Sequence, residues 1–294
     1  MSNNGDANGV HAHVSACAAA DPPKSAQAAS APVLVVGAGP VGLAAAAWLA
    51  EYGVPVRIID VADAPSPYSK AFAVWRRTMA ALAPLVPPSR WAAAGTPLSR
   101  ITMCDAGHAL ASVTLADADA RGDHALPPGV LLGQAQTEAL LTTALRERGV
   151  EVERGVRLSS FAADADGVDC LLERAAPADE APPGGSAPAA AQQERVRASY
   201  LIGADGARSA VRRGLGDPFP GVTLSRRFLL ADVEVDPPPG PAPAAAGAGL
   251  GRRELESGLW LGAMYLTTTS EGLLMVVPIS PTACRVVLDG GKME

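Results

Sequence analysis

The segment that most constrains the fold is a short apolar run followed by closely spaced glycines. Residues 33–36 read Val-Leu-Val-Val, as expected for a parallel strand that is buried on both faces. Gly37, Gly39 and Gly42 follow with the spacing G-x-G-x-x-G. The first glycine of this pattern permits a tight turn, the second lets a pyrophosphate approach the backbone, and the third lets a helix pack on the strand. The sequence therefore predicts a dinucleotide-binding strand–turn–helix unit.

The residues that follow support this interpretation. The alanine-rich stretch 43–52 predicts a helix that ends at Gly53, and its N-terminus would direct N–H groups at phosphates. Residues 56–59 predict a second strand, and Asp60 follows it 18 positions after the last glycine, where a carboxylate can accept hydrogen bonds from a ribose. Because an acid would repel a 2′-phosphate, FAD or NAD is favoured over NADP here. A glycine-rich turn without a ligand and a solvent-exposed Asp60 are the alternatives.

Composition excludes several other classes of protein. With 294 residues and 48% hydrophobic residues, the chain has enough material for one large or two modest globular domains. Its net charge is −6 and it has no basic stripe, which argues against nucleic acid as a partner. Its four cysteines include no C-x-x-C pair, so we expect no metal site, no disulfide framework and a cytoplasmic location. Residues 31–50 carry no charge, but the glycines and Pro40 interrupt this run, so we predict no integral membrane segment.

Further along the chain, the pattern predicts an α/β unit followed by an antiparallel sheet. We expect a short helix near 78–82 that is ended by prolines, a hairpin over 98–126, and a helix over 134–148. The dipeptide Asp166-Gly167 predicts a second hairpin. The further predicted strands cover residues 150–152, 156–161, 168–172, 195–202, 228–235, 259–267, 273–279 and 285–288.

A second motif follows the predicted strand that ends at Ile202. Gly203-Ala204-Asp205-Gly206 follows this strand, and a helix is predicted to begin near Ser209. Asp205, Gly206 and Arg212 could together contact a dinucleotide. A strand-to-helix turn whose aspartate merely caps the helix is the alternative.

Taken in order, these segments resemble the FAD-dependent aromatic hydroxylases of the para-hydroxybenzoate hydroxylase type. The matching segments are residues 37–43 (G-A-G-P-x-G-L), Lys70-Ala71 through Arg77-Thr78, Gln134 with Glu138 (Q-x-x-x-E), and the Asp205-Gly206 motif. The resemblance implies an α/β fold: a Rossmann-like FAD-binding βαβ domain with an interleaved antiparallel-sheet substrate domain. It also implies an enzyme in which NADH or NADPH reduces FAD, and the flavin captures O₂ as a hydroperoxide that hydroxylates an aromatic or polyketide-like substrate.

The resemblance assigns roles to individual residues and regions. The implied cofactor-binding residues are Gly37, Gly39, Pro40, Val41, Gly42, Asp60, Lys70, Arg77, Gln134, Asp205, Gly206, Ser209 and Arg212. We expect a disordered tail (1–30), an FAD-binding domain in two parts (31–97 and 127–217, with a disordered loop at 175–193), a substrate-domain hairpin (98–126) and a substrate-domain sheet (218–294, with a linker at 236–250). No side chain is expected to act as a nucleophile or base, and Trp260, Met264 and Tyr265 are candidates for the substrate pocket.

Three departures from the family pattern leave other interpretations open. Asp60 stands where glutamate is more usual, and Lys70 replaces an arginine, which binds with a different geometry. The family's G-D-A-A-H motif is absent, and its nearest counterpart, residues 289–294, stands at the end of the sequence. We therefore expect a C-terminally truncated version of such an enzyme. The alternatives are a nucleotide-binding remnant without turnover and an NAD-dependent dehydrogenase that uses only the first glycine motif.

Overall fold

The computed structural model describes most of the chain. It covers residues 31–66, 71–105, 108–115, 126–174, 192–223, 225–234, 259, 261–268, 272–280 and 282–292. Lys70, Trp260, the predicted tail 1–30 and the predicted linker 236–250 lie outside the described residues, as does the predicted loop 175–193 except for its last two positions. Predictions for those segments stay predictions.

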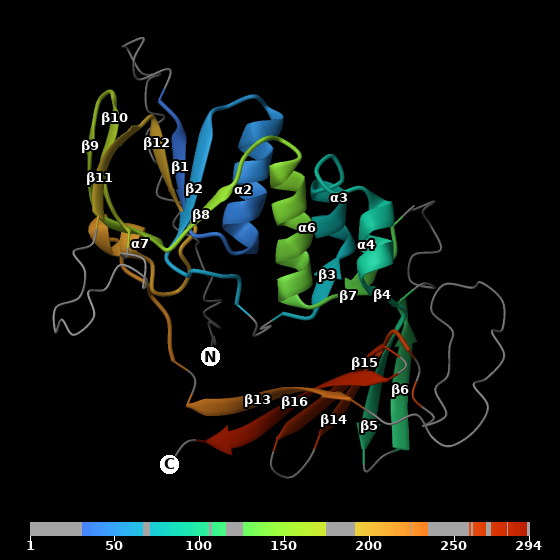
Figure 1. The fold of residues 1–294 in the computed structure, drawn as a ribbon. Coiled ribbons are helices and arrows are strands. Elements are labelled where there is room, and N and C mark those ends of the chain that lie inside the picture. Colours follow the sequence, from blue (N-terminus) through green and yellow to red (C-terminus); the bar gives the residue numbers. More distant parts are fainter. Residues whose placement is uncertain are drawn as a thin grey trace, which may run out of the picture.

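A parallel sheet with the strand order β12-β1-β2-β8 forms the centre of the larger part of the molecule (Figure 1). Its strands are β1 (Val33–Val36), β2 (Val56–Asp60), β8 (Val152–Arg154) and β12 (Tyr200–Gly203). All four residues of β1 are buried, because β1 lies between two neighbouring strands and both its faces are covered. The predicted strands at 33–36 and 56–59 are confirmed, with β2 extending one residue further to Asp60, whereas β8 begins two residues later than predicted because the Val150 N–H still bonds to the Leu145 carbonyl of the preceding helix.

Two helices cover one face of this sheet. Helix α2 (Pro40–Glu51) packs on β1 and β2, and α6 (Gln134–Arg146) lies beside α2 (Figure 1). A single hydrophobic cluster joins Val35 and Ile58 of the sheet to Leu43 of α2 and Leu145 of α6. Both predicted helices are confirmed. None of the helices in the described part of the chain combines the length and apolar character that a membrane crossing requires.

The other face of the parallel sheet is covered by a three-stranded antiparallel sheet. This sheet has the order β11-β10-β9 and consists of β9 (Val156–Asp164), β10 (Gly167–Arg174) and β11 (Gln192–Ala198). Leu34, Val36 and Ile59 alternate with the residues that face α2, and they pack with Leu158 and Leu172 of this second sheet. The hairpin predicted at Asp166-Gly167 is confirmed by the pairing of β9 with β10.

The single strand predicted over 195–202 is wrong, because the chain divides there between two sheets. β11 pairs with β10, whereas β12 pairs with β1 in the parallel sheet. Ser199 lies at the bend between them, and its N–H bonds to the Pro32 carbonyl. No glycine or proline marks this bend, so the division follows from tertiary pairing rather than from local sequence.

A small sheet and two short helices complete the larger part of the molecule. The sheet has the order β3-β7-β4 and consists of β3 (Ala73–Trp75), β4 (Thr96–Leu98) and β7 (Gly129–Leu131), none of which was predicted. Helix α3 (Arg76–Ala81) matches the predicted short helix. Helix α4 (Pro88–Ala94) was missed because its prolines were interpreted only as the end of a helix, although Pro88 occupies the first helical position, which proline favours.

A six-stranded sheet lies below this body in Figure 1. Its order is β13-β16-β15-β14-β5-β6, formed by β5 (Arg100–Asp105), β6 (His108–Thr114), β13 (Arg226–Glu234), β14 (Ala263–Thr268), β15 (Leu273–Ser280) and β16 (Ala283–Lys292). The hairpin predicted within 98–126 is confirmed as β5–β6. The expectation of a wholly antiparallel sheet is corrected at one place, since β14 runs parallel to β5.

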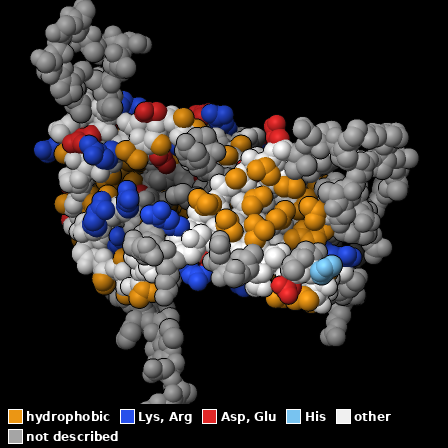
Figure 2. Space-filling view, turned by 90° about the horizontal axis from the view of Figure 1, so that it is seen from below, with side chains coloured by type: hydrophobic (Ala, Val, Ile, Leu, Met, Phe, Trp, Pro, Cys, Tyr) orange, Lys and Arg blue, Asp and Glu red, His pale blue; other side chains and the backbone are white. Residues whose placement is uncertain are grey.

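This sheet presents hydrophobic side chains to its surroundings. Figure 2 shows them gathered over the sheet when the molecule is seen from below. Every described position of β13 is exposed. The exposed large hydrophobic residues on its strands are Met103, Leu110, Val113, Phe228, Leu229, Leu230, Val233 and Leu273.

Candidate cofactor-binding site

The loop after β1 needs glycine at two positions because its backbone is tightly packed. Gly37 has φ +102°, and a Cβ there would lie 2.4 Å from the Ala204 carbonyl oxygen. A Cβ at Gly42 would lie 1.8 Å from the Gly37 carbonyl oxygen. These two glycines therefore let β1, α2 and the segment after β12 come together, which agrees with their predicted roles in the turn and in helix packing.

The middle glycine differs from the other two. Gly39 has an ordinary φ of −75°, and a Cβ there would meet nothing within 4 Å. It is the N-cap of α2 but provides no side-chain hydrogen bond, and Pro40 follows at the first helical position. The first turn of a helix has N–H groups without intrahelical partners and a partial positive charge. Open space over this helix end is what an approaching phosphate requires.

Asp60, at the end of β2, ties the glycine loop to the sheet. Its Oδ2 accepts a hydrogen bond from the Ala38 N–H (2.6 Å), and its Oδ1 accepts one from the Ala62 N–H (2.8 Å). The Arg154 Nη1 lies 3.8 Å from Oδ2. The carboxylate thus holds the loop in place from the position predicted for ribose binding.

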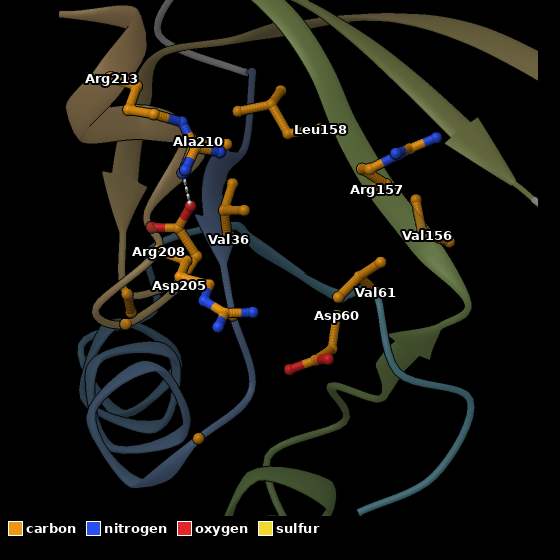
Figure 3. A pocket seen from close by; sticks show the side chains of 14 residues that line it. Val36, Asp60, Val61, Val156, Arg157, Leu158, Asp205, Arg208, Ala210 and Arg213 are labelled. Atoms are coloured by element: carbon orange, nitrogen blue, oxygen red, sulfur yellow. Dashed lines mark hydrogen bonds between the residues drawn. The ribbon is translucent and has the colours of Figure 1, made fainter. Parts of the chain in front are cut away.

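Asp205, after β12, both caps a helix and leaves an oxygen without a partner. Helix α7 (Ala210–Gly214) donates two hydrogen bonds to this carboxylate, from the N–H groups of Ala210 (2.6 Å) and Val211 (3.3 Å) to Asp205 Oδ2. The capping contact considered in the sequence is therefore present, and Figure 3 shows the bond to Ala210. The second oxygen, Oδ1, is buried and has no hydrogen-bond partner among the described residues. A buried acceptor in this state is ready for a ligand hydroxyl.

These groups border a cavity of about 450 Å³ (Figure 3). Gly37, Gly39 and Asp60 lie on one side, and Asp205 and Gly206 on another. The cavity is also lined by Val156, Arg157 and Leu158 of β9, and by Arg208 and Arg213. Three arginines around a site that also holds two aspartates favour an anionic ligand with hydroxyl groups.

A second cavity, of about 590 Å³, lies on the other side of the start of α2. Pro40 and Val41 of α2 line it together with Arg77 of α3 and Gln134 of α6. The Gln134 Nε2 donates to Oε1 of Glu138 (2.9 Å), a residue that is only 6% exposed. This bond fixes which end of the Gln134 amide faces Glu138. The N-terminal turn of α2 thus borders both cavities.

The structure brings most of the predicted site residues together. Gly37, Gly39, Asp60, Asp205 and Gly206 line the first cavity, and Pro40, Val41, Arg77 and Gln134 line the second. Gly42 packs beneath the loop. Lys70 lies outside the described residues.

Ser209 and Arg212 line neither cavity. The Ser209 Oγ accepts the Arg212 N–H (2.9 Å) as the N-cap of α7. The Arg212 guanidinium lies 4.4 Å from the centre of the Phe219 ring, and its Nη1 donates to the Ala207 carbonyl (3.0 Å). Both residues hold the shape of the segment around Asp205.

Sequence reasoning missed the arginines of the first cavity. Arg208 and Arg213 stand within or next to the second motif, so their charge beside a predicted phosphate site was a usable signal. Arg157 gave no such signal, because β9 reaches the cavity only through the packing of the hairpin sheet on the parallel sheet.

A parallel sheet with an open glycine loop at a helix N-terminus and acids at the ends of the two strands that flank β1 defines a dinucleotide-binding protein of the Rossmann-like class. Within that class, the chain belongs to the FAD binding domain family, whose model matches residues 30–286. This result confirms the predicted α/β fold and agrees with FAD as the cofactor.

Known relatives extend this assignment. The 6-methylpretetramide 4-monooxygenase of Streptomyces rimosus is 35% identical over 204 residues, which are 69% of this chain and 33% of that protein. The aklavinone-11 hydroxylase, solved with FAD and aklavinone, is 25% identical with a TM-score of 0.65, over 88% of this chain and 45% of that one. The p-nitrophenol 4-monooxygenase of Pseudomonas putida DLL-E4 shares the fold at 24% identity, with a TM-score of 0.70 over 89% of this chain and 58% of that one. The chain spans less than half the length of the curated relatives it matches.

Proposed function

We propose that this chain binds FAD with the pyrophosphate over the N-terminus of α2 and the two ends of the cofactor in the two cavities. The observation that carries the proposal is the open position at Gly39, in a loop where Gly37 and Gly42 are tightly packed. A helix end without a side-chain cap, beneath free space, offers its N–H groups to a phosphate. The unpartnered Asp205 Oδ1 adds an acceptor for a cofactor hydroxyl.

The residues of each cavity would then have distinct tasks. Asp60 would serve the ribose, and Arg208 and Arg213 would offset the negative charge of the phosphates. Arg77 and Gln134 would contact the part of the cofactor in the second cavity. Ser209 and Arg212 would act indirectly, by holding the segment around Asp205. The division into an FAD-binding domain and a substrate domain, with the limits predicted from the sequence, belongs to this proposal.

We further propose that the activity served by this site is hydroxylation of an aromatic or polyketide-like substrate with NADH or NADPH and O₂, in the cytoplasm. Similarity to the 6-methylpretetramide 4-monooxygenase and the aklavinone-11 hydroxylase supports this class. When bound, FAD supplies the electron transfer and oxygen chemistry, so the protein needs to bind, orient and exclude water. Met264 and Tyr265 of β14 remain the candidates for contact with the substrate. A nucleotide-binding remnant without turnover is the competing outcome.

A titration with FAD tests the first proposal, with Gly39→Ala as the informative variant. Because a methyl group at position 39 meets no protein atom, G39A should unfold at the wild-type denaturant concentration. The same methyl group would occupy the space of the pyrophosphate, so FAD affinity should fall at least about tenfold, which corresponds to about 1.4 kcal/mol. Quenching of flavin fluorescence measures the affinity.

Gly290→Ala is the matched control. A Cβ at Gly290 would make an ordinary contact of 3.5 Å with the Arg227 carbonyl oxygen, on the six-stranded sheet and outside both cavities. G290A should therefore bind FAD like the wild type. A folded wild-type chain that shows no saturable FAD binding, or a G39A variant with unchanged affinity, would contradict the proposal. Oxidation of NADH or NADPH that aromatic compounds stimulate would separate the hydroxylase from the remnant.

A further inference from the structure

Arg285 of β16 is a buried cation that lines neither of the two cavities. It is 4% exposed, and it faces Asp232, its cross-strand neighbour on β13. Its Nε donates to Asp232 Oδ1 and its Nη2 to Oδ2, both at 2.6 Å, so the guanidinium is held in a two-bond fork. This contact lowers the pKa of Asp232 below its ordinary value. Burying a guanidinium is costly unless such bonds satisfy it, which makes its further contact informative.

The third nitrogen of the Arg285 guanidinium, Nη1, bonds to a residue outside the six-stranded sheet. The Arg285 Nη1 donates to the Ala71 carbonyl oxygen at 3.2 Å. That same oxygen accepts the backbone N–H of Gln134, the first residue of α6, at 3.0 Å. Ala71 and Gln134 both line the second cavity. One carbonyl thus joins an arginine of the six-stranded sheet to a residue that lines the second cavity.

We propose that Arg285 is a positioning residue: it sets the place of Ala71, and through it the backbone of Gln134, relative to the second cavity, while Asp232 holds the guanidinium in place. This inference rests on the proposed FAD site. Lysine could not replace the arginine, because a single ammonium group cannot bond both Asp232 oxygens and reach Ala71 with the geometry of a planar fork.

The chain offers a matched comparison on the same two strands. Arg226 of β13 forms an ion pair with Asp289 of β16 through its Nη1. Among the described residues, neither member of this pair lines either cavity. Arg285→Lys and Arg226→Lys therefore make the same chemical change in the same strand pair, and only the first disturbs the contact with Ala71.

The experiment measures FAD affinity, the absorption spectrum of bound flavin and backbone amide exchange in the wild-type chain and in R285K and R226K. R285K should weaken FAD binding between about threefold and thirtyfold and shift the flavin spectrum, as expected for coupling through one contact. Exchange of the Gln134 N–H should become faster in R285K, with or without FAD. R226K should leave all three at wild-type values. Asp232→Glu, which keeps both charges and moves the fork by one methylene, should act in the same direction as R285K and carries the test if R285K does not fold.

A double-mutant cycle separates positioning from general stability. If Arg285 acts through Gln134, R285K should weaken FAD binding little further in a Gln134→Ala background, because the side chain to be positioned is gone. Independent, multiplicative losses would overturn the proposal, and so would wild-type affinity, spectrum and exchange in both R285K and D232E. Absence of FAD binding by the wild type would instead contradict the proposed function, while exchange at Gln134 would still decide whether Arg285 sets its position.

Discussion

The parallel sheet and the six-stranded sheet both contain many apolar residues but are covered differently. Both faces of the parallel sheet are packed: one against α2 and α6, the other against the hairpin sheet β9–β11. Among the described residues, the six-stranded sheet shares one small buried cluster with the small sheet of β3, β4 and β7, formed by Leu98, Leu131, Met264 and Val277. Two of these four residues belong to the small sheet of β3, β4 and β7 rather than to the six-stranded sheet.

The two sheets therefore differ in what stabilises them: apolar burial stabilises the parallel sheet, whereas specific polar contacts hold the six-stranded sheet in place. A core packed on two sides gains from apolar burial at nearly every position, without directional requirements. The six-stranded sheet is attached through a few directed bonds, such as Thr96 Oγ1 to the Ile279 carbonyl (2.8 Å), Ser99 N–H to the Gly262 carbonyl (2.8 Å) and Arg285 to Ala71. The first region can hold a cofactor rigidly, whereas the position of the second depends on polar groups that single substitutions can remove.

The sharpest test of the comparison replaces one leucine in each region. Leu145 of α6 is fully buried in the core of the parallel sheet, whereas Leu229 of β13 is 62% exposed. Leu145→Ala should lower the free energy of unfolding by about 2–5 kcal/mol, because it removes buried methyl groups and leaves a cavity. Leu229→Ala should change it by less than about 0.5 kcal/mol. Denaturant unfolding measures both, and equal losses would show that the exposed face of β13 is covered in solution.

The core of the first region could be predicted from sequence because its signals are local. The apolar run 33–36, the glycine spacing and the alanine-rich helix occur consecutively, and each agrees with the next. The same holds for the helix that begins at Gln134 and for the hairpin at Asp166-Gly167. The residues around the glycine loop and Asp205 therefore came together as expected, even though their roles toward FAD stay predictions.

What could not be predicted depends on contacts between distant segments. The strands β3, β4 and β7 have three residues each, too short for periodicity to appear, and they exist because they pair with one another. Nothing in the sequence around Ser199 predicts the end of a strand, yet the chain passes from one sheet to another there. Arg285 stands in an ordinary apolar strand pattern, and its contact with Ala71 spans 214 positions of the sequence. Propensity carries no information about such partners.

A pair of glycine substitutions tests the attachment of the six-stranded sheet. Gly262, just before β14, has φ +79°, and a Cβ there would lie 2.3 Å from the Pro97 carbonyl oxygen. Gly53, after α2, has φ +68°, but a Cβ there would meet nothing within 4 Å. Gly53→Ala should therefore cost only the backbone strain, about 1–2 kcal/mol, whereas Gly262→Ala should add a clash of about 1–3 kcal/mol.

The location of the damage distinguishes the two variants further. G262A should increase amide exchange mainly in β14 and β15 and leave β1 and β2 protected, because the parallel sheet has its own core. Thermal or denaturant unfolding gives the size of each effect, and exchange gives its place. If exchange rose equally in both sheets, the two regions would form one cooperative unit and the comparison would fail.

The smallest effects concern two aspartates, one in each region, that titrate beside arginines. Asp164 of the hairpin sheet accepts hydrogen bonds from Arg197 Nη2 (2.5 Å) and the Asp166 N–H (2.8 Å), and these lower its pKa from 3.8 to about 2. Asp232 also has a lowered pKa, because of its bonds to Arg285. A lowered pKa in the folded state means that each contribution to stability is complete above the ordinary value near 4 and is lost as the pH falls through the folded value.

The consequences of protonation should differ between the two aspartates, because Asp164 and Arg197 are surface groups, whereas protonation of Asp232 leaves the buried Arg285 without its counter-charge. Carboxyl chemical shifts should therefore place the Asp164 midpoint near 2. Amide exchange should increase in β13 and β16 before it does in β9 and β10 as the pH is lowered below 3.8, the ordinary aspartate value. Loosening of the hairpin sheet first would show that the surface pair of Asp164 and Arg197, rather than the contact of Asp232 with Arg285, limits stability in acid.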